Sequence, residues 1–108
     1  MRLANGYAFN RGRLEVLYNN VWGAVCDRGF GLQDGRVACR QLGFSNVSQV
    51  YCCSYFGYSN RPMWLSNVAC NGRENGIAEC NYTIGNNTGC QRYQEVGLEC
   101  TCKCNLII

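Results

Sequence analysis

The pattern of apolar and polar residues near the start of the chain predicts a β-hairpin. The segment RLEVLY at 13–18 is typical of a strand, and the turn signal Asn19-Asn20 ends it. The segment VWGAVC at 21–26 follows at once and is expected to be the hairpin partner. We therefore expect two neighbouring strands joined by a tight turn.

The pattern changes to helical spacing between 33 and 42, where the sequence contains its one convincing helix. The residues with this spacing are Val37, Ala38, Cys39 and Leu42. Asp34 is expected to be the N-cap, because its carboxylate can accept a hydrogen bond from a free amide of the first turn. Gly43 supplies a C-terminal stop.

Three later segments are expected to be short strands between loops: YCCSYF at 51–56, MWLSNV at 63–68 and VGLEC at 96–100. The predicted fold class is therefore α+β, a small sheet packed on one helix. The expected core residues are Leu14, Val16, Trp22, Val25, Val37, Leu42, Phe44, Trp64, Leu65, Val68 and Leu98. A core of this size is marginal with so little regular structure, so covalent staples are expected.

The composition is typical of a disulfide-stapled secreted domain. The chain has 108 residues, which suits one domain, and 10 cysteines, an even number that lets every thiol pair. Sequons begin at Asn46, Asn81 and Asn86, and together they favour glycosylation in the secretory pathway. No apolar run approaches the ~20 residues of a membrane span, so we expect no direct membrane insertion. We interpret the chain as an extracellular piece of a larger secreted or membrane-anchored protein.

The charged residues limit the possible functions. The net charge is +3, and the cations are nine arginines and one lysine. Arginine binds sulfate, phosphate and carboxylate in fork geometry, but this charge is too small and scattered to predict nucleic-acid binding. The absence of histidine excludes Ser-His and Cys-His nucleophile pairs and His-based zinc sites. Because no acids are paired at useful spacing either, we expect no enzyme activity.

Three long segments carry a family resemblance: GRLEVLYNNVWGAVCDRGFGLQDGRVACRQLGF at 12–44, MWLSNVACNGRENGIAEC at 63–80 and CQRYQEVGLEC at 90–100. They resemble the signature of the scavenger receptor cysteine-rich (SRCR) domain, over roughly residues 2–101. The chain is similar to group A of that family, since the additional cysteine pair of group B is absent and Phe44 stands at one of its places. The resemblance implies a single domain at 1–101 with a curved antiparallel sheet cradling one main helix.

The resemblance also implies three disulfides: Cys26–Cys90, Cys39–Cys100 and Cys70–Cys80. It leaves four cysteines over: Cys52, Cys53, Cys102 and Cys104. Neighbouring Cα atoms lie about 3.8 Å apart, below the usual disulfide range, so a Cys52–Cys53 bond is not expected. We expect cross-pairs, in a combination left open, that pin the tail 102–108 to the segment 51–56. A metal–thiolate site in the tail and intermolecular pairing are weaker alternatives.

Many members of this family bind calcium with acidic pairs that follow the first conserved cysteine and precede the last. Calcium needs six to eight hard oxygen ligands. Here Asp27 is followed by Arg28, and the later pair is Gln94-Glu95. We therefore expect a degraded, unoccupied site at Asp27 and Glu95 and no cofactor. The simpler alternative is that Asp27 forms a structural salt bridge or caps a turn and that Glu95 balances a nearby arginine.

The same substitution suggests direct recognition of anions by arginine. The Cys26–Cys90 bridge that the resemblance implies would bring Arg28 and Arg92 near each other, and Arg36 is a further candidate. The alternative is that these arginines are independent and solvated.

The resemblance thus implies a non-catalytic extracellular module that binds protein or polyanionic ligands, such as microbial, glycan or lipoprotein surfaces. The alternatives are a structural or adhesive module, and an accessory domain of a larger secreted or membrane-anchored protein or enzyme.

Overall fold

The computed structural model describes residues 1–85 and 89–101 and contains one helix on a curved sheet. The strands are β1 (Arg2–Ala8), β2 (Arg11–Tyr18), β3 (Val21–Val25), β4 (Asn46–Tyr51), β5 (Met63–Ala69), β6 (Asn81–Ile84) and β7 (Gly97–Thr101). The helix α1 spans Leu32–Gln41, and single 3₁₀ turns occupy Ile77–Glu79 (η1) and Arg92–Gln94 (η2). The expected α+β class, the hairpin, the helix and two of the three later strands are confirmed.

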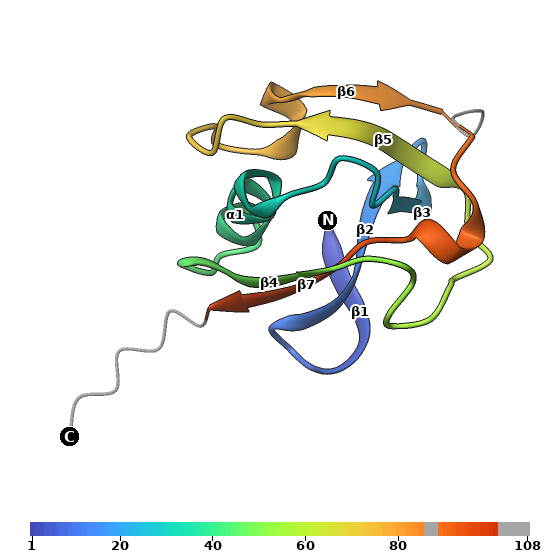
Figure 1. The fold of residues 1–108 in the computed structure, drawn as a ribbon, viewed down its shortest axis with the longest axis horizontal. Coiled ribbons are helices and arrows are strands. Elements are labelled where there is room, and N and C mark those ends of the chain that lie inside the picture. The colour runs from blue at the N-terminus through green and yellow to red at the C-terminus, as the bar shows by residue number, and fades with distance from the viewer. Residues whose placement is uncertain (86–88, 102–108) are drawn as a thin grey trace.

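The sheet has the order β4-β7-β2-β3-β5-β6, and β1 pairs with β2 outside this path. All pairs are antiparallel except β3 with β5, which is parallel. Figure 1 shows α1 between β5 and β6 on one side and β4 and β7 on the other. The sheet therefore curves around the helix and gives it apolar neighbours on two sides.

The core lies between the helix and the concave face of the sheet. Its fully or nearly fully buried members include Leu14, Val25, Val37, Leu65, Val68 and Leu98, all six of them expected from the sequence. The other five expected core residues are only half-buried: Val16, Trp22, Leu42, Phe44 and Trp64.

Trp22 is half-buried because it lies on the sheet face turned away from the helix. It pairs directly with Leu17, while Glu15 on the same face pairs with Ala24. The Arg2 guanidinium covers the indole at 4.0 Å from its centroid. The two faces of the hairpin thus have different chemistry: apolar toward α1, and charged on the other side.

The helix begins one step earlier than expected, and Asp34 is not its N-cap. Gly31 is the N-cap, and Asp34 is buried in the first turn, where its Oδ2 accepts a hydrogen bond from Gly31 N at 2.8 Å. Its Oδ1 accepts a second bond from Cys70 N at 2.7 Å. Asp34 therefore stabilises the helix start and also fixes the end of β5 against it.

The three disulfides that the family resemblance implies are present: Cys26–Cys90, Cys39–Cys100 and Cys70–Cys80, with Cα atoms 6.1, 5.6 and 4.8 Å apart. Cys39–Cys100 ties α1 to β7, and Cys26–Cys90 ties the end of β3 to the segment before η2. The two long-range bridges therefore fix α1 to β7 and the end of β3 to the segment before η2.

The expectation for the remaining cysteines is wrong: Cys52 is bonded to Cys53, with Cα atoms 3.7 Å apart. The segment 51–56 is accordingly not a strand, since β4 ends at Tyr51 and a turn follows. The backbone is left-handed at Cys53 and Ser54, with φ of 68° and 52°, and this turn lets the neighbouring side chains meet. Neither cysteine is available to Cys102 or Cys104, which lie outside the described residues with the rest of the tail 102–108.

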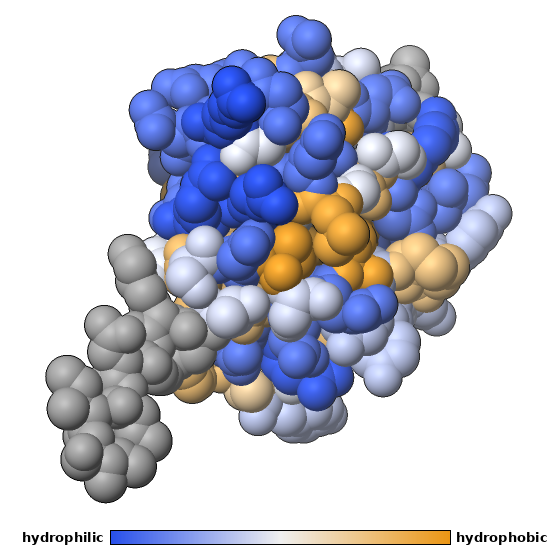
Figure 2. Space-filling model, turned by 60° about the vertical axis from the view of Figure 1, so that its left-hand side comes forward, coloured by the Kyte–Doolittle hydropathy of each residue, from blue (hydrophilic) through white to orange (hydrophobic). Residues whose placement is uncertain are grey.

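The helix and sheet leave part of the apolar surface open. Figure 2 shows a patch of apolar side chains on one face, surrounded mainly by polar residues. A hollow of about 270 Å³ between β2, β6 and η1 is lined mostly by apolar side chains, among them Leu17, Ile77, Tyr82 and Ile84. A domain with one helix does not cover every apolar position of its sheet.

Close packing at Gly23 gives a test of the fold. A Cβ at this position would overlap the Trp64 ring and lie 2.7 Å from Pro62 O, so we expect Gly23→Ala to destabilise the domain by about 1–3 kcal/mol. The matched control is Gly31→Ser, because a Cβ there meets its nearest atom at 4.0 Å and serine is a good N-cap. Urea unfolding with the disulfides intact measures both. Equal stability of the two variants would show that Gly23 is not closely packed against Trp64 and Pro62.

Candidate functional site

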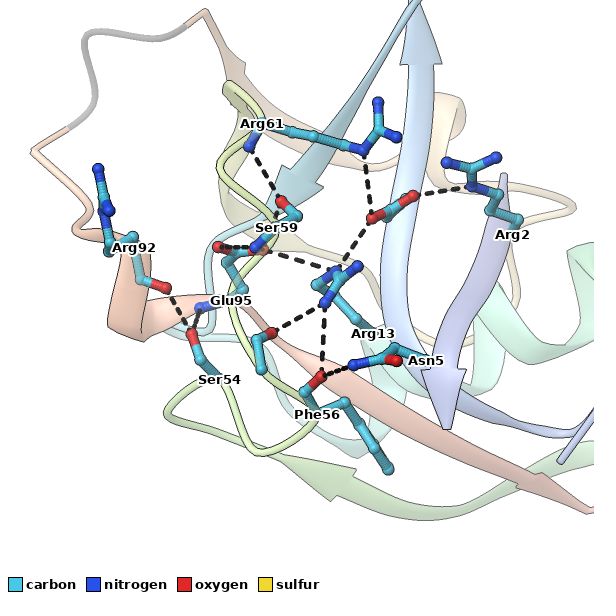
Figure 3. Close-up of polar contacts among 11 residues, drawn as sticks. Arg2, Asn5, Arg13, Ser54, Phe56, Ser59, Arg61, Arg92 and Glu95 are labelled. Carbon is cyan, nitrogen blue, oxygen red and sulfur yellow. Dashed lines mark hydrogen bonds and ion pairs between the residues drawn. The ribbon is translucent and has the colours of Figure 1, made fainter. Parts of the chain in front are cut away.

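Two carboxylates are buried on the sheet face turned away from α1. Glu15, in β2, is fully buried, and Glu95, just before β7, is 2% exposed. Three arginines pair with Glu15, through Arg2 Nε at 2.8 Å, Arg13 Nε at 3.0 Å and Arg61 Nε at 3.8 Å (Figure 3). A charge taken out of water needs such partners, because its desolvation is otherwise strongly unfavourable.

Arg13 is shared between the two buried carboxylates. Its Nε lies 3.0 Å from Glu15 Oε2 and 3.7 Å from Glu95 Oε1. Its Nη1 donates to Gly57 O at 3.0 Å and, at 3.4 Å, to Phe56 O, which also accepts a bond from Asn5 Nδ2 (Figure 3). Arg13 therefore joins β2, the segment before β7 and the turn that follows Cys53.

Glu95 is satisfied mainly by Ser59 and Arg13. Both of its carboxylate oxygens accept from Ser59 N, and Oε1 also accepts from Ser59 Oγ at 2.9 Å. Burial raises the pKa of Glu95 above the ordinary carboxyl value, although the bonds from Ser59 and the charge of Arg13 oppose the shift. The expectation that Glu95 balances a nearby arginine is confirmed.

A small hollow of about 160 Å³ lies beside these buried charges. It is lined by Asn60, Arg61, Met63, Cys90, Arg92 and Glu95. Arg61 lies in the loop before β5, Arg92 begins η2, and both residues are exposed. The Arg92 guanidinium lies over the ring of Tyr58, 5.5 Å from its centroid. Two fork-shaped donors at one hollow can hold an anionic group from two directions.

Arg28 lies next to this hollow. Its Nη2 is 3.3 Å from the Sγ of Cys90, a residue that lines the hollow. The Cys26–Cys90 bridge therefore brings the loops of Arg28 and Arg92 together. Arg36 lies elsewhere, on α1, with its guanidinium beside Gly72. Arg36 is not among the residues that line the hollow.

The residues of the expected calcium site have other bonds. The Asp27 carboxylate accepts a hydrogen bond from Cys53 N at 2.7 Å, while Glu95 is bonded to Ser59 and Arg13. The backbones do lie side by side, since Asp27 N donates to Gln94 O at 2.7 Å. The two carboxylates thus hold different parts of the loop 52–62.

Sequence reasoning missed Arg61, Ser59 and the burial of Glu15. A signal for Glu15 was present, because in a strand Arg13 and Glu15 must share one face. Nothing in the local pattern indicates that a loop more than forty residues later covers that face. Burial of Glu15 is a consequence of tertiary packing.

The charges of the domain are separated between interior and surface. Three of its acids are buried: Glu15, Asp34 and Glu95. Five arginines are exposed: Arg28, Arg36, Arg61, Arg73 and Arg92. The surface that a ligand meets is therefore more cationic than the net charge of +3 suggests.

Two of the three predicted glycosylation sites are placed. Asn46 is the first residue of β4 and Asn81 is the first residue of β6, and both are exposed. These strands are the two outer strands of the sheet path. Asn86 lies outside the described residues. Among the described residues, no helix has the length and apolar character needed to cross a membrane.

The comparisons with known proteins agree with this architecture. The family model of the scavenger receptor cysteine-rich domain matches residues 4–101. The chain belongs to the SRCR family. SRCR domains are extracellular, in secreted proteins or in the ectodomains of receptors, and the SRCR domain itself is a non-catalytic module.

Relatives include receptors and parts of enzymes. The chain is 37% identical over 94% of its length to macrophage scavenger receptor types I and II of Bos taurus, and 44% identical over 85% to lysyl oxidase homolog 2A of Danio rerio. It covers 22% and 12% of those proteins. The SRCR chain thus corresponds to a small part of each relative.

Solved SRCR structures confirm the fold. The dimeric form of the SRCR domain of mouse MARCO matches with a TM-score of 0.78 and 38% identity, over 85% of this chain and 87% of that one. The third SRCR domain of murine neurotrypsin matches with a TM-score of 0.83 and 33% identity, over 92% of both chains.

The shared position of Arg13 predicts a large effect of its removal. Arg13→Met removes the arginine partner of buried Glu95 and one of the three arginine partners of buried Glu15. We therefore expect the free energy of unfolding to fall by about 3–5 kcal/mol. Arg36→Met removes the same charge from an exposed site and should change stability by less than about 0.5 kcal/mol. Thermal unfolding of the oxidised variants distinguishes these outcomes. Similar stability of the two variants would show that Arg13 is not a required link.

The raised pKa of Glu95 predicts a pH dependence. Between the ordinary carboxyl pKa and the raised folded value, the folded state binds the extra proton, so the contribution of Glu95 to stability falls as pH rises. Glu95→Gln cannot titrate. The stability of the wild type minus that of Glu95→Gln should therefore be larger at pH 4 than at pH 7, as measured by thermal unfolding. A difference that increases with pH would contradict the shift.

Proposed function

We propose that this SRCR domain is a non-catalytic recognition module that binds anionic groups of an extracellular protein or polyanion. Arg61 and Arg92 are the central contacts, and Arg28 lies at the margin. The observation that carries the proposal is the hollow lined by two exposed arginines that are distant in sequence, Arg61 and Arg92. Scavenger receptors among the relatives agree with a binding role.

The buried acids support this assignment. An exposed carboxylate next to Arg61 or Arg92 would compete with an anionic ligand for the guanidinium groups. Glu95 does line the hollow, but it is 2% exposed and bonded to Ser59 and Arg13. The free face of the hollow is therefore cationic, and sulfate or carboxylate groups match the fork geometry of arginine.

We further propose that binding needs no calcium. Asp27 already accepts a hydrogen bond from Cys53 N and is followed by Arg28, which supplies no hard oxygen ligand for calcium. Glu95 has a raised pKa and its own partners. These residues hold loops in place, and the arginines provide the contact with the ligand.

A second candidate function is that of an accessory or structural domain in a larger protein. The chain covers only 12% of the lysyl oxidase homolog that it matches. In that case the functional surface contacts a neighbouring domain. Removal of a single arginine at the hollow then leaves the binding of free polyanions to the domain unchanged.

Binding to immobilised heparin at several salt concentrations tests the proposal. Arg92→Ala should weaken binding by roughly tenfold, the effect of losing one charge-assisted contact, whereas Arg36→Ala should have a much smaller effect. Binding should persist with a chelator and weaken with salt. Equal effects of the two variants would show diffuse attraction without a site, and dependence on calcium would show that Asp27 holds an ion.

A further inference from the structure

The Cys52–Cys53 bridge differs from the other disulfides in its exposure. Both of its cysteines are exposed, at the end of β4 and in the turn after it. The remaining bridges of the described residues each include at least one buried cysteine. Those cysteines are Cys26, Cys39, Cys70, Cys80 and Cys100, each 9% exposed or less. A thiolate in solution can therefore approach Cys52–Cys53 more easily than any other described bridge.

A carboxylate stands beside this bridge. Asp27 Oδ2 accepts a hydrogen bond from Cys53 N at 2.7 Å. One carboxylate oxygen of Asp27 and the two sulfur atoms all lie within 4.8 Å of one another. The three atoms therefore lie within reach of one ion once the bridge is reduced, since two donors on one tetrahedral zinc ion are roughly 3.5 Å apart.

We propose that Cys52–Cys53 is a thiol-exchange site whose reduced form binds a thiophilic divalent cation, with the two sulfurs and Asp27 as ligands. The proposal does not rest on anion binding at the arginines. It follows from the exposure of the bridge, the adjacency of its cysteines and the position of the carboxylate.

The exchange needs a thiol reductant and balances as a two-electron step. A thiolate attacks one Sγ, the S–S bond breaks, and the other Sγ leaves with the electron pair as a thiolate. A second reductant thiol then attacks the mixed disulfide. The products are two protein thiols and one disulfide of the reductant. Binding of the cation then displaces the thiol protons, because thiolates are the ligands.

The chosen metal class follows from the donors. Two thiolates favour zinc and cadmium over calcium or magnesium, which prefer oxygen ligands. Cys52 and Cys53 are neighbours in the chain, so reduction cannot separate them far. Water can complete the coordination because both residues are exposed.

A second disulfide with a nearby carboxylate provides an internal comparison for Cys52–Cys53. Cys70, Glu74 and Cys80 form a second group with two sulfurs and a carboxylate within the same distance. These cysteines are 9% and 7% exposed. If exposure decides which bridge reacts, this second group stays oxidised under conditions that open Cys52–Cys53.

Graded reduction with glutathione tests the first part. Free thiols are then blocked with N-ethylmaleimide and located by peptide mass spectrometry, which separates these positions from Cys102 and Cys104. Cys52 and Cys53 should be labelled at a glutathione concentration at least about tenfold below that which opens the other described bridges. Labelling of Cys70 and Cys80 at the same concentration would overturn the proposal.

Cadmium titration of the mildly reduced domain, followed by thiolate-to-metal absorption, tests the second part. Asp27→Asn should weaken cadmium binding by at least about tenfold, and Glu74→Gln should leave it unchanged. Binding should be lost in Cys52→Ser/Cys53→Ser and kept in Cys102→Ser/Cys104→Ser. Loss of cadmium binding in Cys102→Ser/Cys104→Ser, or unchanged binding in Asp27→Asn, would overturn the proposed ligand set.

Discussion

The position of one guanidinium determines how the charged face of this SRCR domain is organised. Arg13 lies between Glu15 and Glu95 and donates to the carbonyl groups of Phe56 and Gly57. It thereby links two carboxylates in the interior, with Arg2 and Arg61 also paired to Glu15, and fixes the loop that covers them. Without it the loop would leave buried charge uncompensated, which is far less favourable than never burying the pair.

This arrangement connects stability with recognition. The acids are used inside the domain, so exposed arginines dominate the surface around Cys90. The Cys26–Cys90 bridge holds the loop of Arg28 against that of Arg92, and Ser54 Oγ accepts a bond from Glu95 N next to η2. The same contacts that fold the loops also decide where the cationic groups meet. Solved SRCR domains share the scaffold on which these charges are placed.

Local patterns predicted the helix, the β2–β3 hairpin, β5 and β7, but they missed β1, β4 and β6 and were insufficient for the charged face. Val37, Ala38 and Cys39 predicted the helix because a helical period needs no tertiary information. The burial of Glu15 depends on a loop that is distant in sequence, and Trp22 is only half-buried because it lies on the outer face, where Arg2 covers it. Cys52–Cys53 was rejected because neighbouring Cα atoms are closer than in most disulfides, yet the bond forms at 3.7 Å, beside a left-handed turn at Cys53. The family motif supplied the three conserved bridges, which no pattern of spacing decides by itself.

A double-mutant cycle between Arg13 and Glu95 tests most directly whether one guanidinium links the buried charges to the loop. The measured quantity is the free energy of unfolding of the wild type, Arg13→Met, Glu95→Gln and the double variant at neutral pH. We predict a coupling energy of at least about 1.5 kcal/mol, because residues in one charged network are not additive. A coupling near zero would mean that the two residues act independently and that the charged face has another organising contact.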